Sequence, residues 1–216
     1  MSRVRKLNIF LINFFAISLA VYFLMNGGAY WRILRYNLFL HTFASDELKT
    51  GEILEVTGIS AGSAVQPVSA HEFTLSIPKI EVNAPIVVPR EITKQGILAS
   101  LEEGVGLYPG SAGIGTPGRA VVLGHSSRAS WYRGEYAYIF ALLHKLEEYD
   151  TFYVTGGGKK YTYQIFANKI MTPQEANAFL ATTPSDSEID LVTCYPVGSA
   201  SKRTVIQAKL ISVENI

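Results

Sequence analysis

Short runs of β-branched and aromatic residues, separated by Gly, Pro and other turn residues, make up most of the sequence after residue 72. Such runs are typical of strands in a half-buried sheet. In chain order they are FTLSIP, KIEVNAPIVVP, RAVVLGH, TFYVTGGGKKYTYQIFANKI, EIDLVTCYP and RTVIQAKLISV. Only residues 91–101 and 137–146 place their apolar residues at helical spacing, so we expect helices there. The pattern predicts an all-β unit whose sheet closes, or nearly closes, on itself.

An uncharged, apolar stretch of nineteen residues runs from Leu7 to Met25. At about 1.5 Å per residue its length is close to the thickness of a bilayer core. Basic residues flank only its N-terminal side, at Arg3, Arg5 and Lys6, which by the positive-inside rule places the N-terminus in the cytoplasm. We therefore predict a single-pass anchor in the cell membrane, with the rest of the chain outside the cell. The alternative is a cleaved signal peptide, whose apolar run is usually only about 7–15 residues long.

The predicted anchor divides the chain into four expected parts. Residues 1–6 form a cytoplasmic basic tail, 7–25 the transmembrane helix, 26–71 a juxtamembrane helix and linker, and 72–216 the β-rich domain. Within the third part, residues 30–43 are mostly apolar or aromatic with two Arg, which suits a helix at the membrane interface and also a helix packed on the domain. The small, polar residues that follow are typical of a linker.

Composition excludes several classes of function. Hydrophobic residues make up 48% of the sequence, which excludes an intrinsically disordered chain. Residues 46–216 carry 14 basic and 18 acidic residues, and this acidic balance argues against nucleic acid as a partner. No group of residues has the spacing of a metal or nucleotide motif, so we expect no metal and no cofactor. The chain has a single cysteine, so no disulfide can form within it.

That cysteine, Cys194, ends a predicted strand just before a Pro/Gly loop, and Arg203 begins the next run nine residues later. If the two runs pair antiparallel, the guanidinium returns toward the thiol. A guanidinium near a thiol stabilises the thiolate and can donate to a developing oxyanion. His125 ends another predicted strand, RAVVLGH. Singly, such a Cys or His is more often a core residue, but the three together indicate nucleophilic catalysis.

The sequence resembles the sortases, membrane-anchored cysteine transpeptidases that join surface proteins to cell-wall precursors or to one another. The resemblance covers about residues 72–212 and lies in GVGLYPGSAGIGTPGRAVVLGHSS, which contains His125, and in EIDLVTCYPVGSASKRTVIQAKLI, which contains Cys194 and Arg203. The family's Thr-Leu-x-Thr-Cys signature appears with Asp190 in place of the first Thr. Along a strand Asp190 is roughly 13 Å from Cys194, so the departure bears on subclass more than on chemistry. The Cys-Tyr-Pro sequence is similar to that of class D and related members.

The resemblance implies a closed β-barrel of about eight strands with one or two short helices. It implies that Cys194 is the nucleophile, His125 the general acid and base, and Arg203 the stabiliser of the tetrahedral intermediate. Thr193 and the backbone amide of Tyr195 would contact the substrate. The implied partners are surface proteins with a Leu-Pro-x-Thr-Gly-like sorting signal and an amine acceptor on the cell envelope, such as a cell-wall precursor or another protein.

Other readings of the same residues fit less well. Papain-like peptidases place Cys before His, and L,D-transpeptidases place His two residues before Cys, whereas here His125 precedes Cys194 by 69 residues. The alternative from another class is a catalytically degenerate, membrane-tethered β-domain that binds a peptide or scaffolds surface proteins. In an enzyme the side chains of His125, Cys194 and Arg203 must converge, whereas in such a binding domain they need not.

Overall fold

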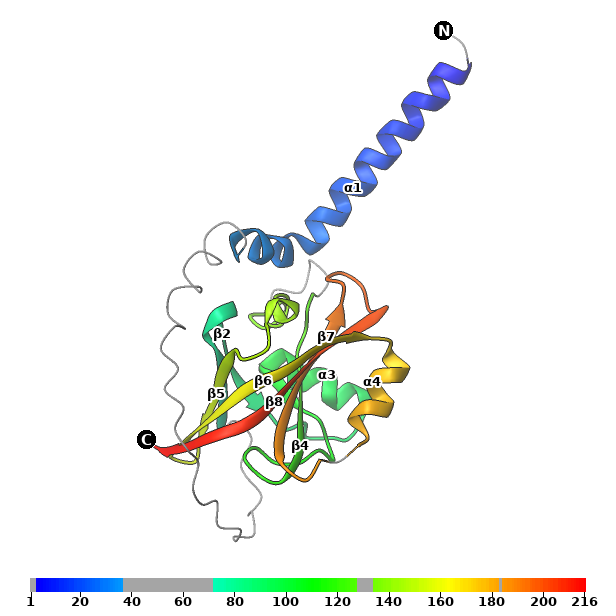
Figure 1. The fold of residues 1–216 in the computed structure, drawn as a ribbon. Coiled ribbons are helices and arrows are strands. Elements are labelled where there is room, and N and C mark those ends of the chain that lie inside the picture. Colours follow the sequence, from blue (N-terminus) through cyan, green and yellow to red (C-terminus); the bar gives the residue numbers. More distant parts are fainter. Residues whose placement is uncertain (1–2, 37–71, 128–133, 183) are drawn as a thin grey trace.

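The computed structural model describes residues 3–36, 72–127, 134–182 and 184–216, and its main body is a closed β-barrel (Figure 1). Around the barrel the strand order is β1-β2-β3-β4-β7-β8-β6-β5. The strands of the described residues are β1 (Phe73–Ile77), β2 (Val82–Val87), β3 (Val105–Leu107), β4 (Gly118–Leu123), β5 (Thr151–Gly156), β6 (Lys159–Met171), β7 (Ser187–Tyr195) and β8 (Lys202–Asn215). The predicted closed all-β fold is confirmed.

Strand pairing follows the predicted runs and adds two parallel pairs. Strands β5 and β6 form a hairpin within the run TFYVTGGGKKYTYQIFANKI, and its turn residues Gly157 and Gly158 have φ of 59° and 70°. Most neighbours pair antiparallel, whereas β2 pairs with β3, and β4 with β7, in parallel. A short 3-10 helix, η2 (Pro78–Ile80), joins β1 to β2. The parallel pair β4/β7 brings together segments that lie far apart in the sequence.

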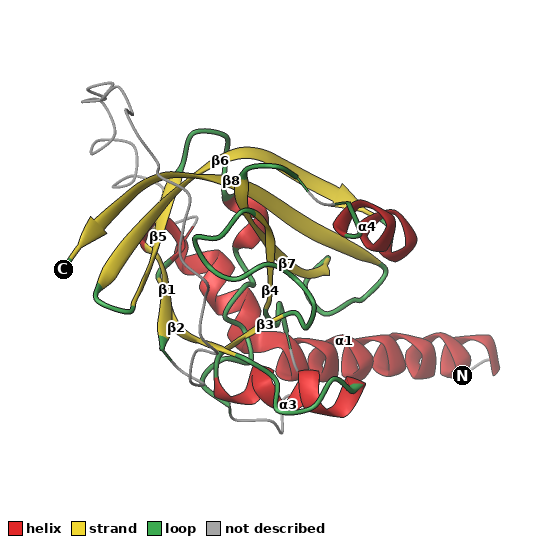
Figure 2. Cartoon of the chain, turned by 90° about the horizontal axis from the view of Figure 1, so that it is seen from below, coloured by secondary structure: helices red, strands yellow, loops and turns green. Residues whose placement is uncertain are grey.

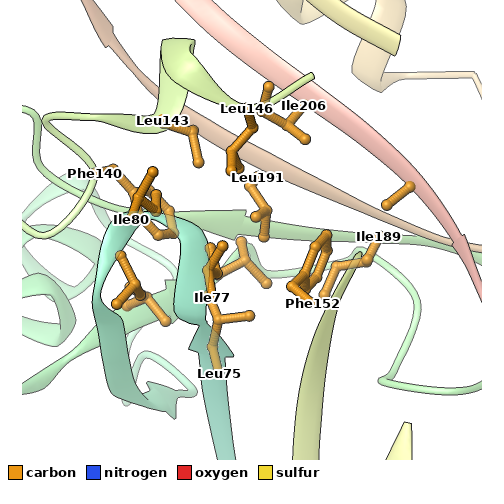
Figure 3. Packing of buried hydrophobic residues seen from close by; sticks show 14 of the residues in the cluster. Leu75, Ile77, Ile80, Phe140, Leu143, Leu146, Phe152, Ile189, Leu191 and Ile206 are labelled. Atoms are coloured by element: carbon orange, nitrogen blue, oxygen red, sulfur yellow. The ribbon is translucent and has the colours of Figure 1, made fainter. Parts of the chain in front are cut away.

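Alternate residues of the strands fill the barrel interior, as the two-residue period of a strand requires. Leu75 of β1, Phe152 of β5 and Leu191 of β7 meet there and are fully buried (Figure 3). The ring of Phe152 stacks on Tyr163 of β6, with centroids 5.6 Å apart. Burial of each such side chain contributes roughly 1.5–3 kcal/mol to folding. The closed sheet therefore surrounds one continuous apolar core.

Besides the N-terminal helix described below, helices α3 (Lys94–Glu103) and α4 (Pro173–Leu180) lie outside the barrel (Figure 2). Helix α3 packs against β2 and β3, and α4 packs against β8. Thr93 caps α3, while Thr172 and Glu175 form the capping box of α4. Helix α3 overlaps the helix predicted over residues 91–101. Helix α4 is not predicted by the apolar spacing of the sequence and is seen only in the structure.

The second predicted helix, over residues 137–146, is wrong. This segment forms turns and ends in a short 3-10 helix, η3 (Leu143–Lys145). Phe140 belongs to the main core, whereas Ala141 packs into a separate cluster, so the segment is buried on more than one side. The amide of Phe140 donates to the carbonyl oxygen of His125 at 2.9 Å. Tertiary packing and this long-range bond take the place of the helical bonds that the apolar spacing predicted.

At the N-terminus, α1 (Arg3–Arg35) first projects from the barrel and then lies across it (Figure 1). No helix in the described part of the chain meets the length and hydropathy of a membrane span by itself, whereas Leu7–Phe23 and Gly27–Arg35, bent by 71°, meet them as a pair. The predicted linker after residue 43 lies outside the described residues.

Candidate active site

The parallel pairing of β4 with β7 sets the position of His125 relative to Cys194. Leu123 lies opposite Val192, and beyond it the Gly124 amide donates to the Val192 carbonyl oxygen at 3.1 Å. Both strands run toward the same end of the barrel, and His125 and Cys194 each lie two residues beyond this last pair. Because paired strands lie about 4.8 Å apart, the two chain segments leave the ladder side by side.

Arg203 approaches Cys194 from the other side. Cys194 and Arg203 are directly opposed in the antiparallel ladder of β7 and β8, so their side chains point to the same face of the sheet. Nη1 of Arg203 donates to the carbonyl oxygens of Ala200 at 2.9 Å and Lys202 at 2.8 Å. These bonds hold the guanidinium at the start of β8. The adjacent strands β4, β7 and β8 thus bring together the regions of all three predicted catalytic residues.

The thiol lies on the outer face of the barrel. Along β7, Leu191 belongs to the interior core, while Val192 packs with Ala176 of α4 on the outside. Alternation therefore gives Cys194 the same outward direction as Val192. Cys194 is a free, partly exposed cysteine. It is accessible to a substrate from outside the barrel.

Thr193 and Tyr195, the two predicted substrate contacts, alternate with Cys194 and direct their side chains to the opposite face. Thr193 is 5% exposed, and its hydroxyl donates to the Gly124 carbonyl oxygen at 2.8 Å. The Tyr195 ring lies against His144, with centroids 5.6 Å apart. Burial lowers the pKa of His144 below its usual range. The Thr193 side chain thus links the two strands that carry His125 and Cys194.

A groove of about 750 Å³ runs along the outer face beside this site. Val121, Leu123 and Val192 are among its apolar lining residues, and Arg203 lies on it. Helix α4 lines one side, and the loop after β3, from Tyr108 to Ala112, also contributes to the lining. Ligand pockets of proteins fall in this size range and combine apolar walls with a few polar groups. The groove can accept an extended peptide of a few residues.

Arg119, at the start of β4, also lines the groove and ties α4 to the sheet. Its Nη1 donates to the carbonyl oxygen of Phe179 at 2.9 Å and to the carbonyl oxygen of Thr182 at 3.0 Å. The guanidinium carbon lies 4.4 Å from the centre of the Phe179 ring. Its other nitrogens form ion pairs with Glu188 at 3.2 Å and with Asp190 at 3.1 Å. One side chain thus joins β4, β7 and the end of α4.

Asp190 stands where the resemblance expects Thr, and it is fully buried under this groove. Burial raises its pKa to about 7, outweighing the opposite effect of Arg119. No local pattern in the sequence connects Arg119 with Asp190, because the parallel register that pairs Arg119 with Glu188 and Val121 with Asp190 joins segments far apart in the chain.

The described residues contain no group of three or more His, Cys, Asp or Glu side chains that could hold a metal ion. The segments that carry a thiol, an imidazole and a guanidinium end on the same side of the barrel, and Arg203 among them lines the apolar groove. This set of groups suits acyl transfer through a thiol nucleophile.

A family model of the sortase domain matches residues 75–211. The chain belongs to the sortase family. None of the curated proteins matches the sequence. The similar solved structures are sortases of several classes. The closed barrel described above matches the fold of this family.

Three of these structures illustrate the similarity. The lid mutant of sortase A from Corynebacterium diphtheriae is 29% identical, with a TM-score of 0.54, over 67% of this chain and 72% of that chain. Sortase C-1 from Actinomyces oris is 26% identical, with a TM-score of 0.56, over 68% and 76% of the two chains. Sortase A from Listeria monocytogenes, at 21% identity and a TM-score of 0.56 over 68% and 92%, shares the fold.

Proposed function

We propose that this sortase is a cysteine transpeptidase that cleaves a Leu-Pro-x-Thr-Gly-like sorting signal and transfers the acyl fragment to an amine on the cell envelope. The observation that carries the proposal is the adjacency of β4, β7 and β8 beside one groove, with His125, Cys194 and Arg203 at the same end. Family membership supports cysteine transpeptidation in general.

In the proposed reaction the thiolate of Cys194 attacks the carbonyl carbon of the scissile peptide bond. Arg203 donates hydrogen bonds to the oxyanion of the tetrahedral intermediate. His125 protonates the departing amine, the C–N bond breaks, and a thioester remains. An incoming amine then attacks the thioester, gives its proton to His125, and releases the thiolate. Transfer to water instead would give slow hydrolysis.

The groove supports binding of the acyl half of the substrate. Its apolar lining suits the Leu and Pro side chains of such a signal, and Arg203 lies on it close to the thiol. A polypeptide bound along it would present a carbonyl carbon at Cys194. Proximity of this kind supplies much of the rate enhancement in acyl transfer.

Sortases are generally membrane-associated, and we extend this to the topology of the present chain. Residues 7–25 would anchor it with the N-terminus in the cytoplasm and the barrel outside the cell. The substrates would then be exported surface proteins, and the acceptor a cell-wall precursor or another surface protein.

The test is the intact mass of the full chain after incubation with pooled peptides of the Leu-Pro-x-Thr-Gly and related types. A mass increase equal to the N-terminal peptide fragment is expected in the wild type and not in Cys194→Ala. The surviving adduct also identifies the preferred motif. Absence of any adduct, together with a Cys194 that is inert to a methanethiosulfonate reagent, would overturn the proposal in favour of a peptide-binding or scaffolding domain.

A further inference from the structure

The last part of α1 is packed into the catalytic domain. Ala29 is fully buried and packs with Ala141 and Val197 in one apolar cluster. A Cβ atom on Gly28 would lie 2.7 Å from Cε2 of Tyr138, closer than Cβ atoms come to their neighbours in proteins. Small residues at positions 28 and 29 therefore permit a close approach of helix and barrel.

Polar contacts fix the same helical segment against the barrel. The guanidinium of Arg32 donates to the carbonyl oxygens of Tyr138 at 3.0 Å and Glu81 at 3.1 Å. Arg35 forms an ion pair with the carboxylate of Glu81. Tyr36, the next residue, is 2% exposed and belongs to the main core. Charge-assisted bonds to carbonyl oxygens are directional, so the helix has one defined position.

Two links lead from this helix to the candidate active site. Val197, which packs against Ala29, lies in the loop between β7 and β8, three residues after Cys194. The segment from Tyr138 to Ala141 also contacts the helix, and within it the Phe140 amide donates to the His125 carbonyl oxygen at 2.9 Å. The helix therefore supports the segments that flank both His125 and Cys194.

A third contact joins the loop after β7 to the segment after His125. The Gly198 amide, in the loop after β7, donates to the hydroxyl of Ser127 at 2.9 Å, two residues after His125. Loops at the end of a barrel are otherwise the least constrained parts of the backbone. Here Val197 of the β7–β8 loop and Ala141 of the segment bonded to His125 belong to one apolar cluster with Ala29.

We propose that residues 27–36 act as a positioning element of the catalytic site, holding the β7–β8 loop and the backbone after His125 in their active arrangement. This inference rests on the proposed function. Ala29 and Arg32 are its positioning residues. They act through Val197 and Tyr138 and contact no substrate. The groove is lined by other segments, so the element governs the chemical step more than substrate binding.

The test compares full-chain variants in detergent micelles. Ala29→Leu adds bulk at a fully buried site and is expected to displace the β7–β8 loop. A displacement of about 1 Å at a catalytic group can lower the rate by about 100-fold. We expect kcat to fall by about 10- to 100-fold with KM changed by less than about threefold. Leu34→Ala, on the exposed side of the same segment, is the matched control and is expected to keep wild-type kcat.

A second pair of variants separates positioning from loss of fold. Val197→Ala combined with Ala29→Leu removes most of the added volume of the cluster and is expected to recover most of the lost kcat. Arg32→Lys, which cannot reach two carbonyl oxygens with a planar fork, is expected to lower kcat in the same way without altering the core. Thermal melting of each variant shows whether it is folded. Wild-type kcat in folded Ala29→Leu and Arg32→Lys would overturn the inference.

A readout independent of turnover keeps this inference separate from the proposed function. The rate of Cys194 modification by a methanethiosulfonate reagent reports how the thiol is presented to a reagent. Because Ala29→Leu is expected to displace the loop that follows Cys194, we expect this rate to change in Ala29→Leu and to equal the wild-type rate in Leu34→Ala. If the wild-type thiol reacts with the reagent but the wild type turns over no peptide, the proposed function fails while the positioning role is still decided. Identical modification rates in all variants would refute the positioning role.

Discussion

The hydroxyl of Thr193 donates to the carbonyl oxygen of Gly124 at 2.8 Å, in a buried position between the strands that carry Cys194 and His125. Thr193→Val keeps the shape and removes the donor, leaving a buried carbonyl oxygen without this bond. We expect the free energy of unfolding to fall by about 1–3 kcal/mol, and kcat to fall because the two strand ends separate. Urea unfolding and steady-state kinetics measure both.

Thr193→Ser is the matched control for that prediction, because it retains the donor. Its kcat should stay close to the wild-type value. If Thr193→Val instead retained wild-type kcat, the bond would be a contribution to stability alone.

Arg203→Lys tests the guanidinium opposite Cys194. A lysine keeps the charge but loses the paired bonds to the carbonyl oxygens of Ala200 and Lys202 that aim the group. We expect kcat to fall by at least about 100-fold with little change in KM, as for loss of an oxyanion donor. Peptide turnover under saturating substrate checks it, and wild-type kinetics would remove Arg203 from the site.

Asp190 predicts a pH dependence of stability. Its pKa is about 7 in the folded chain, against an ordinary value of 3.8, because burial penalises the carboxylate. Between these values the folded state binds the proton more tightly than the unfolded state does. The contribution of Asp190 therefore stabilises the fold as pH falls through 7, by at most about 1.4 kcal/mol per pH unit, and is lost at higher pH.

The measurement is denaturant unfolding of the wild type and Asp190→Asn at several pH values between 5 and 8. The neutral Asn cannot titrate, so the wild type should gain stability relative to the variant as pH is lowered. A difference that stays constant across the range would contradict a titrating carboxyl group at position 190.

Arg119→Lys tests how the wall of the groove is held. The substitution removes the guanidinium nitrogen that donates to the carbonyl oxygens of Phe179 and Thr182, so the end of α4 should loosen. We expect KM for the peptide to rise by about tenfold, equivalent to about 1.4 kcal/mol of binding, with kcat much less affected. Arg90→Lys, at an exposed arginine, is the control. If Arg119→Lys and Arg90→Lys had the same KM, this would argue against a role of Arg119 in binding.

Much of the barrel can be predicted from the sequence because strands carry a local signal. Alternating residues and the glycines of the β5–β6 turn are sufficient for the hairpin, and the short interval from Cys194 to Arg203 is sufficient for their pairing. His125 is different. The approach of its strand to the strand of Cys194 depends on a parallel pairing across 69 residues, and only the family resemblance indicates that pairing in the sequence.

Other features depend on tertiary packing and leave little trace in the sequence. Helical spacing over residues 137–146 reflects burial on several sides, which a helix-period count cannot distinguish from one buried face. Helix α4 is short, but its capping box at Thr172 and Glu175 was a readable start signal. No comparable sequence signal predicts that Ala29 packs against the barrel. A small residue indicates a close approach only when the residues that it contacts are known.

The parallel pairing of β4 with β7 also determines when the site can form. The β5–β6 hairpin joins residues close in sequence, whereas Val122 meets Leu191 only after a long loop has closed. Such closure costs entropy before any contact offsets it, and non-local pairings form slowly. In a newly made chain the segments that carry Cys194 and His125 are therefore still far apart. The proposed site is complete only when the barrel is complete.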